Sequence, residues 1–195
     1  MSNYYTPCVL QETAEGLKRI PIEDMMFQRR EIQCDGEINR ETVNAMILQL
    51  RYLQALDDTK EITIFVNSPG GSVTDGLALI DTMAAIRCPI RTVCMGIAAS
   101  MGSLIFASGN SRDILPHARV MIHDPLISGG VGGSALKLDA IAKDLMRARE
   151  TTAKILSACT GRTIEEILDK TAQDTYFSAE EALEFGLADR IIHEI

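Results

Sequence analysis

The chain has 195 residues, of which 46% are hydrophobic and 24% charged, and its formal net charge is −8. This composition predicts one globular domain with a sizeable core and excludes a disordered chain. The negative charge and the lack of a Lys/Arg cluster argue against nucleic-acid binding. No apolar run reaches the roughly 18 residues that a membrane span needs, so we expect no membrane partner.

The five cysteines and three histidines are scattered along the chain. No Cys-x-x-Cys pair occurs, which favours buried thiols. No two histidines are close together, so we expect no His/Cys metal site, and we expect no cofactor. Residues 1–5 are polar and lack the basic-then-apolar pattern of a signal peptide. We therefore expect a cytoplasmic protein.

The first half of the chain mixes an irregular start with clear periodic segments. Residues 6–36 show only short extended pieces, and we expect a flexible start there. Residues 39–56 carry apolar side chains three and four apart, which predicts an amphipathic helix. Residues 61–66 form a β-rich run, and the sequence Asn-Ser-Pro-Gly-Gly at 67–71 predicts a turn after it. Ser72 and Asp75 are typical of a helix start.

The helix that starts near Ser72 is expected to run to about Arg87, where Cys88-Pro89 stops it. Residues 90–95 predict a strand, residues 101–107 a short apolar helix, and residues 119–122 another strand. Strands that alternate with helices predict a parallel sheet covered by helices.

Three chemically useful features directly follow strand-like runs: the Gly70-Gly71 turn, Ser100 and His123. Ser100 stands at a strand-to-helix junction, where a sharp bend exposes the hydroxyl and the first helical N–H groups are unpaired. Because ligands bind at the carboxyl ends of parallel strands, we expect these features to converge. Ser100 and His123 also have purely structural interpretations: Ser100 as a small residue at a helix start, and His123 as a strand-end histidine bonded to backbone.

Residues 134–160 predict a long helix, opened by Ser134 and closed by Gly161. Its near-heptad apolar stripe packs either on its own domain or on a partner subunit, and both alternatives stay open. The glycine-rich residues 128–133 indicate a mobile or substrate-approaching segment. Beyond the long helix, two short helices are expected behind the capping boxes that begin at Thr163 and Ser178, followed by a strand at 191–192.

Four separated motifs occur in one family's order: Asn67-Ser68-Pro69-Gly70-Gly71, Gly96-x-Ala98-Ala99-Ser100-Met101-Gly102, Arg119-Val120-Met121-Ile122-His123, and a tail from Asp174 through Ser178, Glu181 and Gly186 to Asp189. The chain thereby resembles the proteolytic subunit of the Clp protease. The resemblance implies an α/β, crotonase-like fold of repeated β-β-α units with a protruding handle helix. It implies a single proteolytic domain over 1–195, with an axial N-terminal segment at 1–20 and the glycine-rich segment and handle helix at 126–160.

The resemblance also implies a serine peptidase site. Ser100 would be the nucleophile and His123 the general base, while Asp174 would orient and stabilise the imidazolium. The backbone N–H groups of Gly71 and Met101 would bind the oxyanion. The alternative for Asp174 is an ordinary turn carboxylate.

The same resemblance implies an assembly. Two stacked heptameric rings would enclose a chamber, with the handle helix between the rings. An ATP-driven AAA+ unfoldase would deliver unfolded protein chains for peptide-bond hydrolysis, and the subunit itself would need neither a metal nor a nucleotide.

Several positions depart from the family pattern. Gln173 stands where the family often has an arginine that contacts the other ring. Asp124 follows the histidine where glutamine is usual, and its carboxylate either acts on His123 or faces solvent. The insertion of Ile127-Ser128 lengthens the substrate-side loop.

The expected unfoldase-docking cleft has lost aromatic residues: of positions Thr63, Phe65 and Ala85, only Phe65 is aromatic. We therefore hypothesise a divergent paralogue that works best in a mixed complex with a paralogous subunit. Two alternatives remain: a poorly active ring subunit that modulates an active paralogue, and an acyl-CoA enzyme of the crotonase type.

Overall fold

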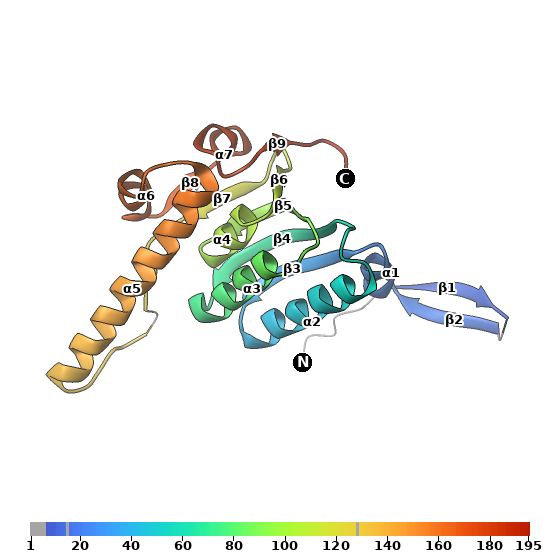
Figure 1. The fold of residues 1–195 in the computed structure, drawn as a ribbon, viewed down its shortest axis with the longest axis horizontal. Helices are drawn as coiled ribbons and strands as arrows, with labels where there is room; N and C mark the ends of the chain where they lie inside the picture. The colour runs from blue at the N-terminus through green and yellow to red at the C-terminus, as the bar shows by residue number, and fades with distance from the viewer. Residues whose placement is uncertain (1–6, 15, 128) are drawn as a thin grey trace.

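A computed structural model describes residues 7–14, 16–127 and 129–195 (Figure 1). Within them, seven strands form one sheet with the order β3-β4-β5-β6-β9, and β7 pairs with both β5 and β8. The pairings are parallel except for β7 with β8, so the predicted parallel sheet is confirmed. The strands are β1 (Cys8–Thr13), β2 (Gly16–Pro21), β3 (Glu31–Ile38), β4 (Ile62–Gly71), β5 (Ile90–Ala99), β6 (Ser111–Ile114), β7 (Arg119–Ile122), β8 (Thr175–Phe177) and β9 (Arg190–Ile191).

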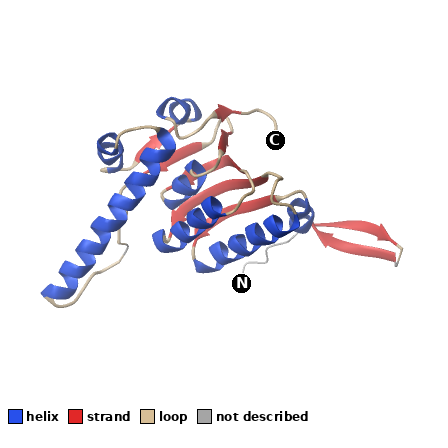
Figure 2. Cartoon of the chain, in the orientation of Figure 1, coloured by secondary structure: helices blue, strands red, loops and turns tan. Residues whose placement is uncertain are grey.

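Seven helices occur in the described residues, and Figure 2 shows α2 and α3 lying together over one face of the sheet. They are α1 (Ile22–Gln28), α2 (Arg40–Leu56), α3 (Val73–Ala85), α4 (Met101–Ala107), α5 (Ala135–Thr160), α6 (Ile164–Thr171) and α7 (Ala179–Phe185). The apolar stripe of α2 is buried in the core, as its spacing predicts. All seven residues of α4 are buried, so this short helix is part of the core itself. Among the described residues, no helix combines the length and the apolar character that crossing a bilayer requires.

The helix starts follow the predicted capping chemistry. Thr163 and Ser178 each exchange hydrogen bonds with the glutamate three residues later, so both capping boxes are confirmed. Ser72 accepts a hydrogen bond from the backbone N–H of Asp75, although no reciprocal bond completes a box. Helix α5 begins after Ser134 and ends at Gly161, whose φ of 73° is left-handed. Each cap satisfies N–H or C=O groups that a helix end leaves unpaired.

Three strand predictions need correction. Residues 67–71 are not a turn but the end of β4, which passes a bulge between Val66 and Ser68 and continues beside β3. Strand β5 likewise extends past residue 95 to Ala99. The irregular region contains regular structure after all: an antiparallel β1–β2 hairpin, then α1 and β3. Residues 1–6 of the expected axial segment lie outside the described residues.

Helix α5 leaves the body of the molecule, on the opposite side from the β1–β2 hairpin (Figure 1). Its buried residues are Thr152, Ala153 and Leu156, all in its C-terminal half. Toward its N-terminus the side chains are open to solvent, and Leu136 is 83% exposed. Packing on its own domain therefore accounts for only one end of the apolar stripe.

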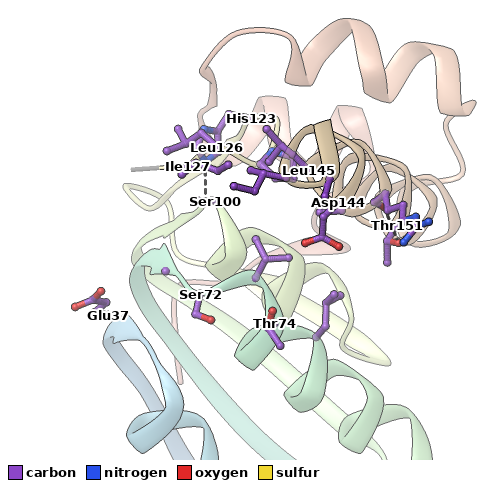
Figure 3. Close-up of a pocket in the computed structure, with 18 of the residues that line it drawn as sticks. Glu37, Ser72, Thr74, Ser100, His123, Leu126, Ile127, Asp144, Leu145 and Thr151 are labelled. Carbon is purple, nitrogen blue, oxygen red and sulfur yellow. Dashed lines mark hydrogen bonds between the residues drawn. The ribbon is translucent and has the colours of Figure 1, made fainter. Parts of the chain in front are cut away.

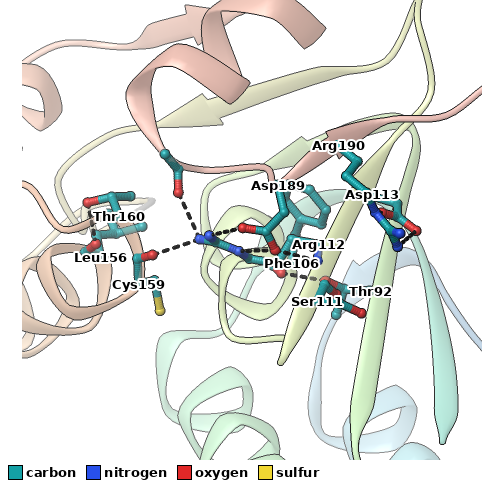
Figure 4. Close-up of polar contacts among 11 residues, drawn as sticks. Thr92, Phe106, Ser111, Arg112, Asp113, Leu156, Cys159, Thr160, Asp189 and Arg190 are labelled. Carbon is teal, nitrogen blue, oxygen red and sulfur yellow. Dashed lines mark hydrogen bonds and ion pairs between the residues drawn. The ribbon is translucent and has the colours of Figure 1, made fainter.

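A network centred on Arg112 anchors the C-terminal end of α5 (Figure 4). The Arg112 guanidinium donates hydrogen bonds of 2.7 Å to the carbonyl oxygens of Cys159 and Gly186. It also pairs with the Asp189 carboxylate, and these hydrogen bonds hold the pKa of Asp189 below its usual range. One side chain thus joins β6 to α5 and to the turn after α7, which fixes the base of the projecting helix.

Candidate active site

Ser100 has a backbone conformation that few residues other than glycine adopt, with φ 54° and ψ −124°. It joins β5 to α4. Such a backbone costs on the order of 1–3 kcal/mol and persists only where its surroundings enforce it. The Ser100 N–H donates to the carbonyl of Met121 over 2.9 Å, and the Ser103 hydroxyl donates to the carbonyl of Ser100 over 2.6 Å. The strained turn is therefore held from both sides.

Met101 fixes the first turn of α4 against α3. Its side chain is buried and packs so closely on Gly76 that a Cβ there would lie 2.2 Å from Met101 Cγ. As the first residue of α4, Met101 has an N–H with no acceptor inside the helix. This donor directly follows Ser100, where an oxyanion formed on a bound carbonyl needs one.

The end of β4 passes close beside Ser100 because it lacks side chains. A Cβ at Gly70 would lie 2.6 Å from the Cβ of Ser100, and one at Gly71 would lie 2.1 Å from the carbonyl oxygen of Ile38. The amides on either side of Gly71 are engaged: Gly70 N–H donates to Ser68 Oγ over 3.1 Å, and Ser72 N–H donates to Ile38 over 2.8 Å. These bonds anchor the peptide groups on both sides of the one that carries the Gly71 N–H.

His123 lies at the end of β7 and Asp174 just before β8. The antiparallel register pairs Ile122 with Thr175, so the next residues along are His123 and Asp174. His123 Nε2 is 2.7 Å from Ser100 Oγ (Figure 3). On its other side, His123 Nδ1 is 3.5 Å from Asp174 Oδ1. The His123 side chain is 15% exposed and that of Asp174 is 61% exposed, so the contact with Asp174 is the looser one.

A groove of about 940 Å³ opens beside Ser100 and His123 (Figure 3). The start of α3 forms one wall through Ser72, Thr74 and Leu77, and the side of α5 forms the other. The α5 wall carries apolar, acidic and basic side chains: Lys137, Ala140, Ile141, Asp144, Leu145, Arg147, Ala148 and Thr151. Leu126 and Ile127 lie at its edge, while Ser128 of the inserted pair lies outside the described residues. The groove can hold an extended peptide with a carbonyl near Ser100.

The family model for Clp protease matches residues 14–195. The chain belongs to the Clp protease family. Membership implies peptidase activity, and members of this family generally form rings that pair with unfoldases. The mixed α/β structure with its parallel sheet fits the Clp protease fold, so the fold expected from the resemblance is confirmed. This family match favours a peptidase over the acyl-CoA enzyme alternative.

In this Clp protease chain, both carboxylate oxygens of Asp124 are hydrogen-bonded to residues other than its neighbour His123. Its Oδ2 accepts a hydrogen bond from Arg149 Nε over 2.5 Å, and its Oδ1 accepts one from the Thr171 hydroxyl over 2.6 Å. The expectation that this carboxylate either faces solvent or acts on His123 is therefore incomplete. It links the loop after His123 to α5 and α6.

Sequence reasoning missed Thr171 and Arg149, and it did not assign the α5 side chains to the groove wall. Thr171 is the last residue of α6 and Arg149 lies within α5, and neither belongs to one of the sequence motifs. The one available signal was Asp124, a charged residue at a position where the Clp protease family usually has glutamine.

Proposed function

We propose that this chain is a serine endopeptidase subunit that hydrolyses peptide bonds of unfolded proteins. The observation that carries the proposal is the 2.7 Å approach of His123 Nε2 to a Ser100 hydroxyl held in a strained turn at the start of a buried helix. A serine hydroxyl is a weak nucleophile at neutral pH unless a base takes its proton, and this geometry supplies the base.

In the proposed reaction, Ser100 Oγ attacks the scissile carbonyl while His123 Nε2 takes the hydroxyl proton. The tetrahedral oxyanion accepts hydrogen bonds from the N–H groups of Gly71 and Met101. His123 then returns the proton to the leaving amine, and a water molecule activated by His123 hydrolyses the acyl-enzyme. Asp174 faces the Nδ1 side of the ring. Its carboxylate favours the neutral tautomer with a protonated Nδ1 and an unprotonated Nε2, and it then stabilises the imidazolium that forms during the reaction.

The proposed assembly is a pair of stacked heptameric rings fed by an ATP-driven AAA+ unfoldase in the cytoplasm, with residues 1–195 acting as one proteolytic domain. The exposed N-terminal half of α5 supports a contact with a partner subunit. Gln173 is exposed and cannot supply the positive charge expected there. The one aromatic residue retained in the expected docking cleft, Phe65, is buried. Because neither residue offers the contact expected at its position, the proposal includes a mixed complex with a paralogous subunit.

The alternative of a poorly active, modulating subunit is less well supported, because the Ser100–His123 pair already lies at hydrogen-bonding distance. Peptide cleavage by the purified chain alone separates the two functions. If the chain needs a paralogue, it will sediment as an incomplete assembly by itself and gain unfoldase-dependent degradation when the paralogue is added. A stable, fully active double ring of this chain alone would contradict the mixed complex.

A fluorophosphonate probe tests the proposed nucleophile. We expect the native chain to form a covalent adduct that mass spectrometry places on Ser100, and we expect Ser100→Ala and His123→Ala to abolish labelling. Ser111→Ala is the matched control, because Ser111 lies on β6 outside the groove, and its labelling should equal that of the native chain. An adduct on another residue, or undiminished labelling of Ser100→Ala, would refute the assignment.

A further inference from the structure

The residue that follows His123 is bonded to the segment that precedes Asp174. The Asp124 N–H donates to the carbonyl of Thr171 over 2.7 Å, and the Thr171 hydroxyl donates to the Asp124 carboxylate over 2.6 Å. Thr171 is buried at the end of α6, and Asp174 is the third residue after it. A charged acceptor with a buried hydroxyl makes a stronger bond than two neutral groups do.

These bonds close one end of a short loop whose other end is also anchored. Residues 172–174 run between Thr171 and Thr175, and Thr175 pairs with Ile122 in the β7–β8 ladder. The loop that carries Asp174 is therefore attached to the His123 strand twice, once before His123 and once after it. The Asp174 side chain adds little restraint to the loop, because its carboxylate is 61% exposed and its Oδ1 is 3.5 Å from His123 Nδ1.

Arg149 connects the same carboxylate to α5. Its Nε donates to Asp124 Oδ2 over 2.5 Å, and both side chains are about 70% shielded from solvent, with exposures of 28% and 30%. Arg149 lies one turn before Thr152, where α5 becomes buried in the body of the molecule. The two carboxylate oxygens of Asp124 are thus divided between α5 and α6.

We propose that Asp124 is a positioning residue that sets the relative placement of His123 and Asp174. Through Thr171 it holds the Asp174 loop, and through Arg149 it ties that loop and the His123 strand to the base of α5. The inference rests on the proposed function, since it assigns a role in aligning the imidazole with its carboxylate. Asp124, Thr171 and Arg149 do not line the groove, so they act on the chemistry without contacting the peptide.

The test uses the full chain, in its assembled form, with a short fluorogenic peptide amide and a fluorophosphonate. The variants are Asp124→Asn, Thr171→Val, Arg149→Gln and the double variant Asp124→Asn/Arg149→Gln. Because a displacement of about 1 Å in a catalytic group costs up to about 100-fold in rate, we expect Asp124→Asn to lower kcat by about 10- to 100-fold. KM should change by less than about twofold, since the groove is untouched.

The double variant distinguishes positioning from two separate effects. If Asp124 acts through Arg149, the double variant will lose no more kcat than the worse single variant, because the interaction can be lost only once. Thr171→Val should lower kcat with an unchanged KM as well. Multiplied losses in the double variant, or a rise in KM equal to the fall in kcat, would overturn the proposal.

A control separates positioning from folding. Lys143→Gln removes another positive charge from α5, in an exposed pair with Asp139 that does not line the groove, and it should keep the native kcat. Sedimentation and thermal unfolding of every variant accompany the kinetics. A kcat loss that appears only in variants that fail to assemble would overturn the positioning role. Absence of fluorophosphonate labelling in the native chain would instead refute the proposed function. The positioning role is tested separately, by the ratio of variant kcat to native kcat.

Discussion

Replacing Asp174 with asparagine removes a negative charge from the side of His123 that faces away from Ser100. The side chains approach over 3.5 Å, between His123 Nδ1 and Asp174 Oδ1, whereas a charge-assisted hydrogen bond measures about 2.7–2.9 Å. The carboxylate is also 61% exposed. We therefore predict a smaller loss of activity than the roughly 10⁴-fold that follows removal of a buried, hydrogen-bonded triad carboxylate.

The attraction between the carboxylate and an imidazolium on His123 sets the size of the loss. At 3.5 Å, Coulomb's law gives about 1.2 kcal/mol in the dielectric of water and about 4.7 kcal/mol at an effective dielectric of about 20. Because the Asp174 side chain is largely exposed, the value lies in the lower part of this range and is screened by salt. Since each 1.36 kcal/mol of activation free energy changes the rate about tenfold, we predict that Asp174→Asn lowers kcat/KM by about 10- to 100-fold.

Peptide cleavage by the assembled Asp174→Asn variant measures this loss, at about 0.05 M and at about 0.5 M salt. The ratio of native to variant activity should shrink at the higher salt concentration. Asp169→Asn is the matched control, since it removes an exposed carboxylate from the nearby helix α6 and should leave kcat/KM unchanged. A 10⁴-fold loss that does not respond to salt would refute the reasoning, because it would require a close, shielded bond between Asp174 and His123.

Two further predictions concern the glycine at the end of β4 and the buried thiols. Gly71→Ala places a Cβ 2.1 Å from the carbonyl oxygen of Ile38, so kcat for a fluorogenic peptide should fall at least about 100-fold through a displaced amide. Gly161→Ala is the control for backbone strain: it also puts a Cβ on a left-handed backbone, with φ 73°, but that Cβ meets nothing within 4 Å, so kcat should stay native. Burial raises the pKa of Cys34 and Cys94 from 9.0 to about 12. As the pH rises, the thiols therefore lose their protons in the unfolded chain before they do so in the folded one. The free energy of unfolding should fall above about pH 9, by about 2 kcal/mol per thiol at about pH 10.5. Denaturant titrations of Cys34→Ala and Cys94→Ala should show a smaller fall with pH than the native chain, and an equal fall would contradict the prediction.

The convergence of Ser100 and His123 could be predicted from the sequence because it follows from parallel strands. Each residue ends a strand-like run, and the carboxyl ends of parallel strands share one edge of a sheet. Asp174 has no such signal: it was nominated by the family resemblance alone. Its approach to His123 depends on the antiparallel pairing of β7 with β8, two short strands far apart in the chain. Pairing between distant strands leaves no periodic pattern in either one.

Helices were predicted more accurately than strands for a related reason. The stripe of α2 and the capping boxes at Thr163 and Ser178 are local patterns, and local interactions produce them. Residues 67–71 were predicted as a turn because Pro69 and the following glycines normally interrupt a strand. In the structure, β3 pairs with this segment, and the Ser68 hydroxyl donates to the carbonyl of Gly36 over 2.6 Å. Pairing with β3 makes residues 67–71 a strand rather than a turn, and nothing in the sequence of these five residues predicts that pairing.

The two sides of the candidate site differ in how firmly the fold holds them. Ser100 and Met101 belong to the start of a helix that is buried throughout, so their backbone can change only if the core does. Asp174 instead stands on an exposed loop that depends on Asp124, Thr171 and the base of α5. Local stability falls from the core toward such peripheral segments. We therefore expect a change in the surroundings of α5, such as contact with the proposed partner subunit, to alter the His123–Asp174 distance before it disturbs the Ser100 turn.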